Sequence, residues 1–216
     1  MRVWNASSAA TDLPDVIAAT CGTVRARTAP LADRAAHAAA EALGQQWFGP
    51  NFNESVFDHW AARVAHLLFV AEERETGAFL GYADQMFLAP AVDVALRAGT
   101  MAEEDFGAHA VLGDAELLAL PAGTSVTLYL AGMCVTAPGT PQGHEAAKAL
   151  RECRRVLVGE WRARGLHLAI VMAAATEAGE RLAQRAGGRL VSPAAERVDG
   201  YNLYELPDLL QDAVGE

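Results

Sequence analysis

The chain has 216 residues, of which 52% are hydrophobic and 20% are charged, with a formal net charge of −10 and an isoelectric point near 5.0. This length and composition predict one folded domain and exclude wholesale disorder. The negative charge disfavours extended contact with nucleic acid or anionic membrane, because both need clustered lysine and arginine.

The three cysteines, Cys21, Cys134 and Cys153, lie far apart and show no C-x-x-C spacing. We therefore expect no disulfide framework and no metal site. The first residues lack a basic region followed by an apolar core, and no apolar run approaches the roughly 18 residues that span a bilayer. A cytoplasmic protein without a membrane partner is the expectation.

The first third of the chain is predicted to be mostly helical after a short strand at Val3-Trp4. Thr11-Asp12 followed by Pro14 is typical of a helix start, which predicts a helix over 13–25. Alanine-rich residues 30–46 predict a second helix, which Gly49-Pro50-Asn51 ends. A third helix begins at a capping Asn53 or Ser55, since apolar residues then recur at helical spacing: Val56, Trp60, Val64 and Leu67.

The apolar periodicity then changes to that of strands. Residues 66–71 and 78–83 flank a glycine-containing turn and predict an antiparallel hairpin. Residues 89–123, with helical stretches near 91–98 and 114–120, are interpreted as an insertion between strands. The remaining elements are predicted in the order strand 125–135, helix 144–164, strand 167–172, helix 176–186, and strands 189–191 and 201–206.

This order of elements resembles that of the GNAT N-acetyltransferase superfamily, and four segments carry local matches: 10–14, 69–82, 130–150 and 173–188. The resemblance covers nearly the whole chain except 89–123. It implies an α/β fold with a mixed, mostly antiparallel twisted sheet flanked by helices, and an insertion between the third and fourth strands. It also implies a single domain over 1–216, a homodimer, and transfer of an acyl group from acyl-CoA to the amine of a small metabolite in biosynthesis.

The donor site follows from the resemblance. A turn of free backbone N–H groups that opens a helix binds the CoA pyrophosphate. The superfamily pattern R/Q-x-x-G-x-G/A aligns with 142–147, where Gln142 and Ala147 fit but Glu145 replaces a glycine. A carboxylate about 5 Å from a phosphate charge costs about 3 kcal/mol at an effective dielectric near 20. The expected donor-binding residues are Met133, Cys134, Val135, Gln142, Gly143, His144, Ala147 and Thr176.

Two departures from the superfamily keep alternatives open. Glu145 raises the alternative of a donor carried on a carrier protein or an aminoacyl-tRNA. Ala183 stands where the superfamily places a tyrosine that protonates the leaving thiolate, which raises the alternative of a binding module without catalysis. A basic face at Arg151 and Arg155 is interpreted either as a phosphate contact or as a solvated helix face.

Amine acylation needs a pocket, an oriented thioester carbonyl and a base. The main-chain N–H groups of 133–135 are expected to face the carbonyl. The catalytic candidates are Glu72, Asp84 and Tyr129, with His59 and His66 as further bases, and a surface or core role is the alternative for each. Aromatic residues of the helical region are expected to line the acceptor pocket or to pack in the core: Trp47, Phe48, Phe52, Phe57 and Trp60.

All of these expectations depend on one geometric feature. Strands 125–135 and 167–172 should be parallel neighbours that separate along part of their length, so that a V-shaped gap receives the arm of the donor.

Overall fold

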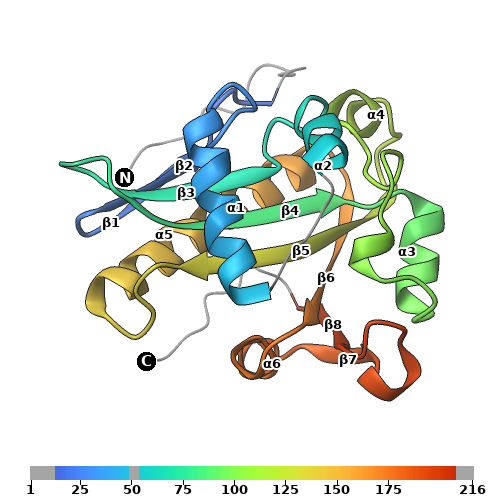
Figure 1. Ribbon diagram of the computed structural model, residues 1–216. Helices are drawn as coiled ribbons and strands as arrows, with labels where there is room; N and C mark the ends of the chain where they lie inside the picture. Colours follow the sequence, from blue (N-terminus) through green and yellow to red (C-terminus); the bar gives the residue numbers. More distant parts are fainter. Residues whose placement is uncertain (1–12, 49–53, 208–216) are drawn as a thin grey trace.

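The structure is a computed structural model that describes residues 13–48 and 54–207 (Figure 1). Their strands form one eight-stranded sheet in the order β1-β2-β3-β4-β5-β6-β8-β7. Every neighbouring pair is antiparallel except β5 and β6, which run parallel. The predicted mixed, mostly antiparallel α/β fold is therefore confirmed. The expected strand at Val3-Trp4, the Thr11-Asp12 cap, the break at 49–51, Phe52 and the Asn53 cap lie outside the described residues.

The strands are β1 (Ala18–Cys21), β2 (Val24–Thr28), β3 (Leu68–Glu73), β4 (Phe79–Phe87), β5 (Ser125–Val135), β6 (His167–Ala174), β7 (Arg189–Ser192) and β8 (Asn202–Leu206). The α-helices are α1 (Arg34–Phe48), α2 (Glu54–Ala61), α3 (Pro90–Arg97), α4 (Asp114–Leu118), α5 (Pro141–Ala163) and α6 (Glu177–Arg185). Two short 3-10 helices are η1 (Glu103–Asp105) and η2 (Ala194–Glu196).

The prediction of a helix over 13–25 is wrong, because this segment contains β1 and the start of β2, which form a hairpin. Cys21 pairs with Val24 across a two-residue turn in which Gly22 has a φ of +56°. Such a turn favours glycine and matches the twist of the two strands. The sequence contains the alternation expected of a strand: every second residue, Val24, Ala26 and Thr28, is buried, while Arg25 between them is exposed.

Two helix starts differ from the predicted ones in a way that matters for the site. Helix α1 begins at Arg34 rather than at residue 30. Helix α5 begins at Pro141 rather than at residue 144, because the Thr140 hydroxyl accepts a hydrogen bond from the Gly143 N–H at 3.1 Å. Threonine at the cap and proline in the first turn are the preferred residues there.

The predicted β3–β4 hairpin is confirmed, but β4 runs on to Phe87. Asp84 therefore lies inside a central strand and not at the rim of the hairpin. Residues 89–123 supply α3, η1 and α4 between β4 and β5.

The sheet is covered on both faces (Figure 1). Helix α5 crosses one face, where Leu150, Leu157 and Trp161 are buried against the strands. Helices α1 and α2 cover the opposite face, where Leu43 packs with Tyr82 and Cys134. Within the described ranges, no helix combines the length and the hydropathy needed to cross a bilayer.

Candidate active site

The parallel strands β5 and β6 lie together at one end and separate at the other. They pair from Ser125 with His167 to Tyr129 with Val171. Beyond this point β5 continues against β4 alone, and β6 continues against β8. The predicted V-shaped gap between two parallel neighbours of one sheet is confirmed.

A β-bulge lies where the gap opens. Gln85 pairs with Leu130 and Asp84 pairs with Gly132, so Ala131 is an extra residue on β5. A bulge bends its strand and interrupts the ladder of backbone hydrogen bonds. This local bend turns the second half of β5 away from β6.

The buried side chain of Arg154, on α5, donates hydrogen bonds to backbone carbonyl groups at this bulge. Its Nη2 donates to the carbonyls of Asp84 at 2.7 Å and Gly132 at 2.5 Å, and its Nε donates to Gln85 Oε1 at 3.0 Å. Burial lowers the pKa of Arg154 to about 10, so the guanidinium remains charged at neutral pH. The bulge is thus held by a cation beneath the sheet.

The open half of β5 directs main-chain groups into the gap. The Thr136 N–H donates to Leu80 in β4 at 2.9 Å. Because backbone groups alternate sides along an antiparallel ladder, Cys134 also faces β4, whereas Met133 and Val135 face the open side. Of the three residues predicted to orient the acyl carbonyl, Met133 and Val135 thus present their N–H groups to the gap.

A cavity of about 1970 Å³ passes through the gap. Its lining residues come from α1 and α2 on one face of the sheet and from α5 and α6 on the other. We call the part beside α1 and α2 the front half and the part beside α5 and α6 the rear half. A cavity that reaches both faces has room for two substrates that meet at the gap.

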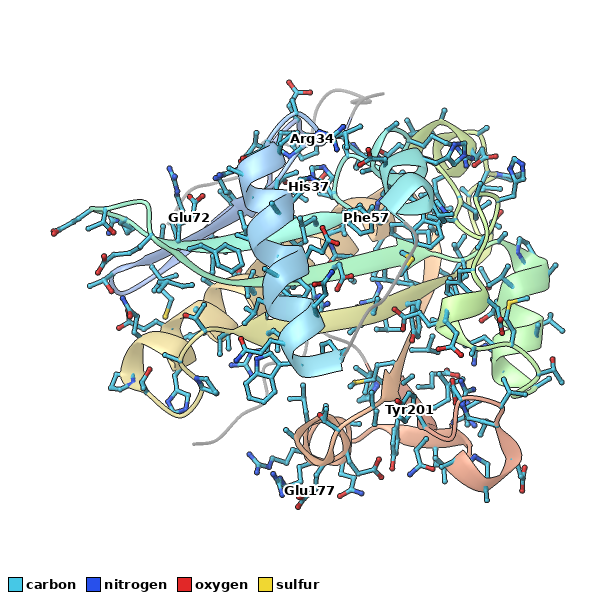
Figure 2. All side chains as sticks on the ribbon, in the orientation of Figure 1. Arg34, His37, Phe57, Glu72, Glu177 and Tyr201 are labelled. Atoms are coloured by element: carbon cyan, nitrogen blue, oxygen red, sulfur yellow. The ribbon has the colours of Figure 1, made fainter. Side chains whose placement is uncertain are left out.

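The front half is aromatic and acidic. Phe57 of α2 and His37 of α1 approach each other at 5.8 Å between ring centroids, and Tyr201 lies further along the cavity (Figure 2). Of the predicted aromatic residues, Trp47, Phe48 and Phe57 line the cavity. Trp60 is instead fully buried in the core, where its indole N–H donates to the carbonyl of Gly107 at 3.2 Å.

Asp84 lies at the bulge itself. Its side chain is buried, it lines the cavity, and its Oδ1 has no hydrogen-bond partner within the described part of the chain. A Cβ atom on Gly132 would lie 2.6 Å from Oδ1, so only glycine leaves room for this carboxyl group. Burial raises the pKa of Asp84, opposed by the charge of Arg154. A carboxyl group with a raised pKa is a stronger base than an ordinary aspartate, which suits a role as proton acceptor.

Glu72, the other predicted carboxylate base, lies outside the cavity lining. Its carboxylate pairs with Arg27 at 2.6 Å and with Arg25 at 3.0 Å. Although burial opposes the shift, these arginines lower the pKa of Glu72. Glu72 is therefore an ion-pair partner on the surface of β3, and we do not assign it a role in proton transfer.

The predicted histidine bases also lie outside the cavity lining. His59 is exposed beside Arg63. His66 is buried, with Nδ1 2.9 Å from the Thr28 hydroxyl, and burial lowers its pKa.

Tyr129 is the last residue of β5 that pairs with β6. It contacts Glu103, whose carboxyl group was not among the predicted site residues. Its hydroxyl donates to Glu103 Oε2 at 2.5 Å, and both residues line the cavity. Burial raises the pKa of Glu103 to about 8 and raises that of Tyr129 well above its usual value. Glu103 lies in η1, within 89–123, and nothing in the local sequence distinguishes it from the neighbouring Glu104 and Asp105.

The turn before α5 departs from the expected phosphate-binding turn. Pro141 has no N–H, the Gly143 N–H is bonded to Thr140, and the His144 N–H donates to the Thr140 carbonyl at 3.0 Å. Since α5 has begun at Pro141, later N–H groups bond to carbonyls four residues earlier. Of the predicted residues here, His144 and Ala147 line the cavity, while Gln142 and Gly143 do not.

The charge of Glu145 is directed away from this turn. Its Oε2 accepts hydrogen bonds from the Thr23 N–H at 2.9 Å and from the Thr23 hydroxyl at 3.1 Å. The expected repulsion of a phosphate by Glu145 therefore has no basis in the geometry, because this carboxylate caps the β1–β2 turn.

The second predicted donor segment is partly in place. Thr176 caps α6 through the Gly179 N–H at 3.1 Å and lines the cavity. Ala183 is fully buried near Ala174 and Tyr204, so the position where the superfamily has a tyrosine faces the interior. Cys134 is a buried thiol whose pKa burial raises to about 11, which disfavours a role as nucleophile.

The rear half is basic. The only lysine of the chain, Lys148, lines it together with Arg151 on α5 and Arg185 on α6, and all three are exposed. Arg155 also lines it but pairs with Glu152 at 2.5 Å. In a chain with a net charge of −10, this concentration of cations suits an anionic substrate.

Comparison with known proteins gives structural similarity without sequence similarity. No protein family model matches the chain. No curated protein matches it by sequence.

Three solved structures illustrate the structural similarity. The NatC complex bound to Gag peptide and CoA has a TM-score of 0.53 at 11% identity, covering 86% of this chain and 97% of that one. Mosquito arylalkylamine N-acetyltransferase like 5b has a TM-score of 0.52 at 15% identity, covering 87% and 95%. Arabidopsis thaliana NAA60 in complex with acetyl-CoA has a TM-score of 0.50 at 12% identity, covering 85% and 98%.

Proposed function

Because this chain has the GNAT fold, we propose that it is an acyltransferase that moves an acyl group from acyl-CoA to the amine of a small metabolite. One observation carries the proposal: the cavity passes through the gap between β5 and β6, and the Asp84 carboxyl lies at the bulge where the gap opens. Among the similar structures named above, that of NatC contains CoA, that of NAA60 contains acetyl-CoA, and the mosquito protein is an arylalkylamine N-acetyltransferase.

The two halves of the cavity suit the two substrates. The basic rear half, with Lys148, Arg151 and Arg185, suits the phosphates of the donor. In this proposal the N–H groups of Met133 and Val135 hold the acyl carbonyl, where donors stabilise the charge that develops on oxygen. The acidic and aromatic front half suits an amine that approaches from the opposite face.

Asp84 accepts the proton in this proposal. As the amine nitrogen forms a bond to the acyl carbon and the carbon–sulfur bond breaks, one N–H proton passes to the Asp84 carboxylate and the thiolate leaves. A positioned base of this kind contributes about 100- to 10,000-fold to a rate. Arg154 holds the backbone of Asp84 and Gly132 and is assigned a positioning role.

The turn before α5 favours a second candidate for the donor. Pro141 has no N–H, and the N–H groups of Gly143 and His144 are bonded within the chain, so the turn offers a pyrophosphate group few donors. A thioester on the phosphopantetheine arm of a carrier protein has no pyrophosphate and needs no such turn.

The test uses the purified full chain with acetyl-CoA and a panel of small amines, and mass spectrometry detects N-acetylated products. Calorimetry with CoA and with 4′-phosphopantetheine identifies the donor. Turnover with acetyl-CoA, lost in Asp84→Asn, supports the proposal. Binding of 4′-phosphopantetheine as tight as that of CoA favours the carrier-bound donor. Absence of both binding and turnover for every donor would refute acyl transfer.

A further inference from the structure

The front half of the cavity holds more carboxyl groups than a single proton transfer requires. Asp84 and Glu103 both line it, and neither forms a salt bridge with any residue that the structure describes. The exposed carboxylates of Glu41 and Glu104 lie at the same cavity. One base is sufficient for the amine that reacts, so the second inward-facing carboxyl group needs another explanation.

The arginines that line the front half or lie close to it are already paired. Arg34 binds Asp58 at 2.8 Å, and the buried Arg197 is paired with Asp199. Arg154 contacts the Asp84 backbone from below the sheet. Glu103 receives its hydrogen bond from the neutral hydroxyl of Tyr129. A partly buried carboxyl group with only a neutral partner favours its protonated form, and a cation brought by a ligand would favour its ionised form.

The rear half is basic, so a cationic group of a ligand would not bind there. Lys148, Arg151 and Arg185 lie on α5 and α6, beyond the gap from η1. A second positive charge on the acceptor would be repelled from the rear half and attracted to the front half. The two halves thus separate an anionic donor from a cationic acceptor.

Resting on the acyltransferase function proposed above, we infer that the acceptor is a diamine: one amine reacts beside Asp84, and a second cationic group binds the Glu103 carboxylate that Tyr129 orients. The aromatic side chains at the same cavity, Trp47, Phe48, Phe57 and Tyr201, offer ring faces along which a cationic or apolar chain can lie.

The experiment compares probes that differ only in the second charge: 1,4-diaminobutane against n-butylamine, and 1,5-diaminopentane against n-pentylamine. Their kcat/KM values are measured with acetyl-CoA, and their dissociation constants are measured by calorimetry on the enzyme alone. We expect a preference for each diamine of about tenfold or more, as for hydrogen bonds between charged groups.

Three variants locate the preference. Glu103→Gln should abolish the preference, because kcat/KM should fall about tenfold more for each diamine than for its matched monoamine. Tyr129→Phe, which removes the orienting hydroxyl, should reduce it. Glu104→Gln removes a neighbouring charge from the same 3-10 helix without touching Tyr129, and it should preserve the preference.

Equal binding of diamines and monoamines by the wild-type chain would overturn the inference, as would equal loss of both amines in Glu103→Gln. Binding is measured without turnover, so the inference is tested even if no probe is acetylated. Failure of acyl transfer with a preserved diamine preference would refute the proposed function alone.

Discussion

The two halves of β5 share one strand but serve different purposes. From Ser125 to Tyr129 the strand is paired on both sides, with β4 and β6, and Leu128 and Tyr129 are fully buried. From Leu130 to Val135 it is paired on one side only, and the cavity occupies the other. The composition of the strand does not distinguish the halves. A bulge at Ala131 and a buried arginine from another element produce the difference.

Replacing Arg154 should disrupt the bulge that separates the two halves of β5, and it should have the largest effect on the stability of the protein. Arg154→Leu leaves the carbonyls of Asp84 and Gly132 and the amide oxygen of Gln85 without this donor. Each unsatisfied buried group costs about 1–3 kcal/mol, so we expect a loss of about 3 kcal/mol or more in the free energy of unfolding. Urea denaturation measures it. The half-exposed neighbour provides the control, since Arg155→Leu should cost no more than about 0.5 kcal/mol. Equal effects for the two variants would contradict the role assigned to Arg154.

Neutralising Asp84 tests whether proton transfer takes place at the half of β5 that is paired on one side only. Asp84→Asn should lower kcat/KM about 100-fold or more, because the base is lost. In the wild type, kcat/KM should rise with pH until the carboxyl is ionised, over a range higher than for an ordinary aspartate because burial raises its pKa. The variant should lose this rise. Glu72→Gln is the matched control: it removes a carboxylate that is already ion-paired outside the cavity, and kcat/KM should change less than threefold. A pH profile unchanged in Asp84→Asn would exclude Asp84 as the base.

Much of the fold could be predicted from the sequence because its patterns are local. The strands predicted from the apolar segments 125–135 and 167–172 and the cap predicted at Thr176 are confirmed by β5, β6 and α6. The gap itself followed from the resemblance and is confirmed. The β1–β2 hairpin was missed because Pro14 and its neighbours suggested a helix start, whereas a two-residue turn at Gly22 decides the structure.

The site could be predicted only in part, because its key contacts join distant segments. Asp84 was a candidate, but its burial depends on the full length of β4 and on the space at Gly132. Glu103 reaches Tyr129 across 26 positions of sequence, and Glu145 reaches Thr23 across 122. No periodicity encodes such contacts. The choice between Glu72 and Asp84 likewise required the positions of the arginines.

Glu103 lies against Tyr129, where the two halves of β5 meet, and it should give the protein a pH-dependent stability. Its pKa in the folded chain is raised to about 8, so between the unfolded value and pH 8 the folded state binds more protons than the unfolded state. Stability from this group is therefore fully present at low pH and is lost as pH rises through about 8. Thermal melts at pH 7 and pH 8 should show that Glu103→Gln, which stays neutral, loses about 1 kcal/mol less than the wild type between these two pH values. Parallel curves for the two proteins would show that Glu103 does not hold its proton.

The smallest effect concerns the helix that follows the open half. Glu145→Ala removes two hydrogen bonds to Thr23, and we expect a loss of about 1 kcal/mol in the free energy of unfolding. The Kd for CoA should change by less than about twofold, because the carboxylate points to the β1–β2 turn and its charge is screened by solvent. The opposite expectation follows if Glu145 turned toward a bound phosphate: relief of about 3 kcal/mol of repulsion would tighten CoA binding by roughly two orders of magnitude. Calorimetry on the two proteins at one salt concentration separates these outcomes. Tighter CoA binding by Glu145→Ala would show that the Glu145 side chain weakens pyrophosphate binding. An unchanged Kd would leave the bonded N–H groups that follow Thr140 as the cause of any weak binding.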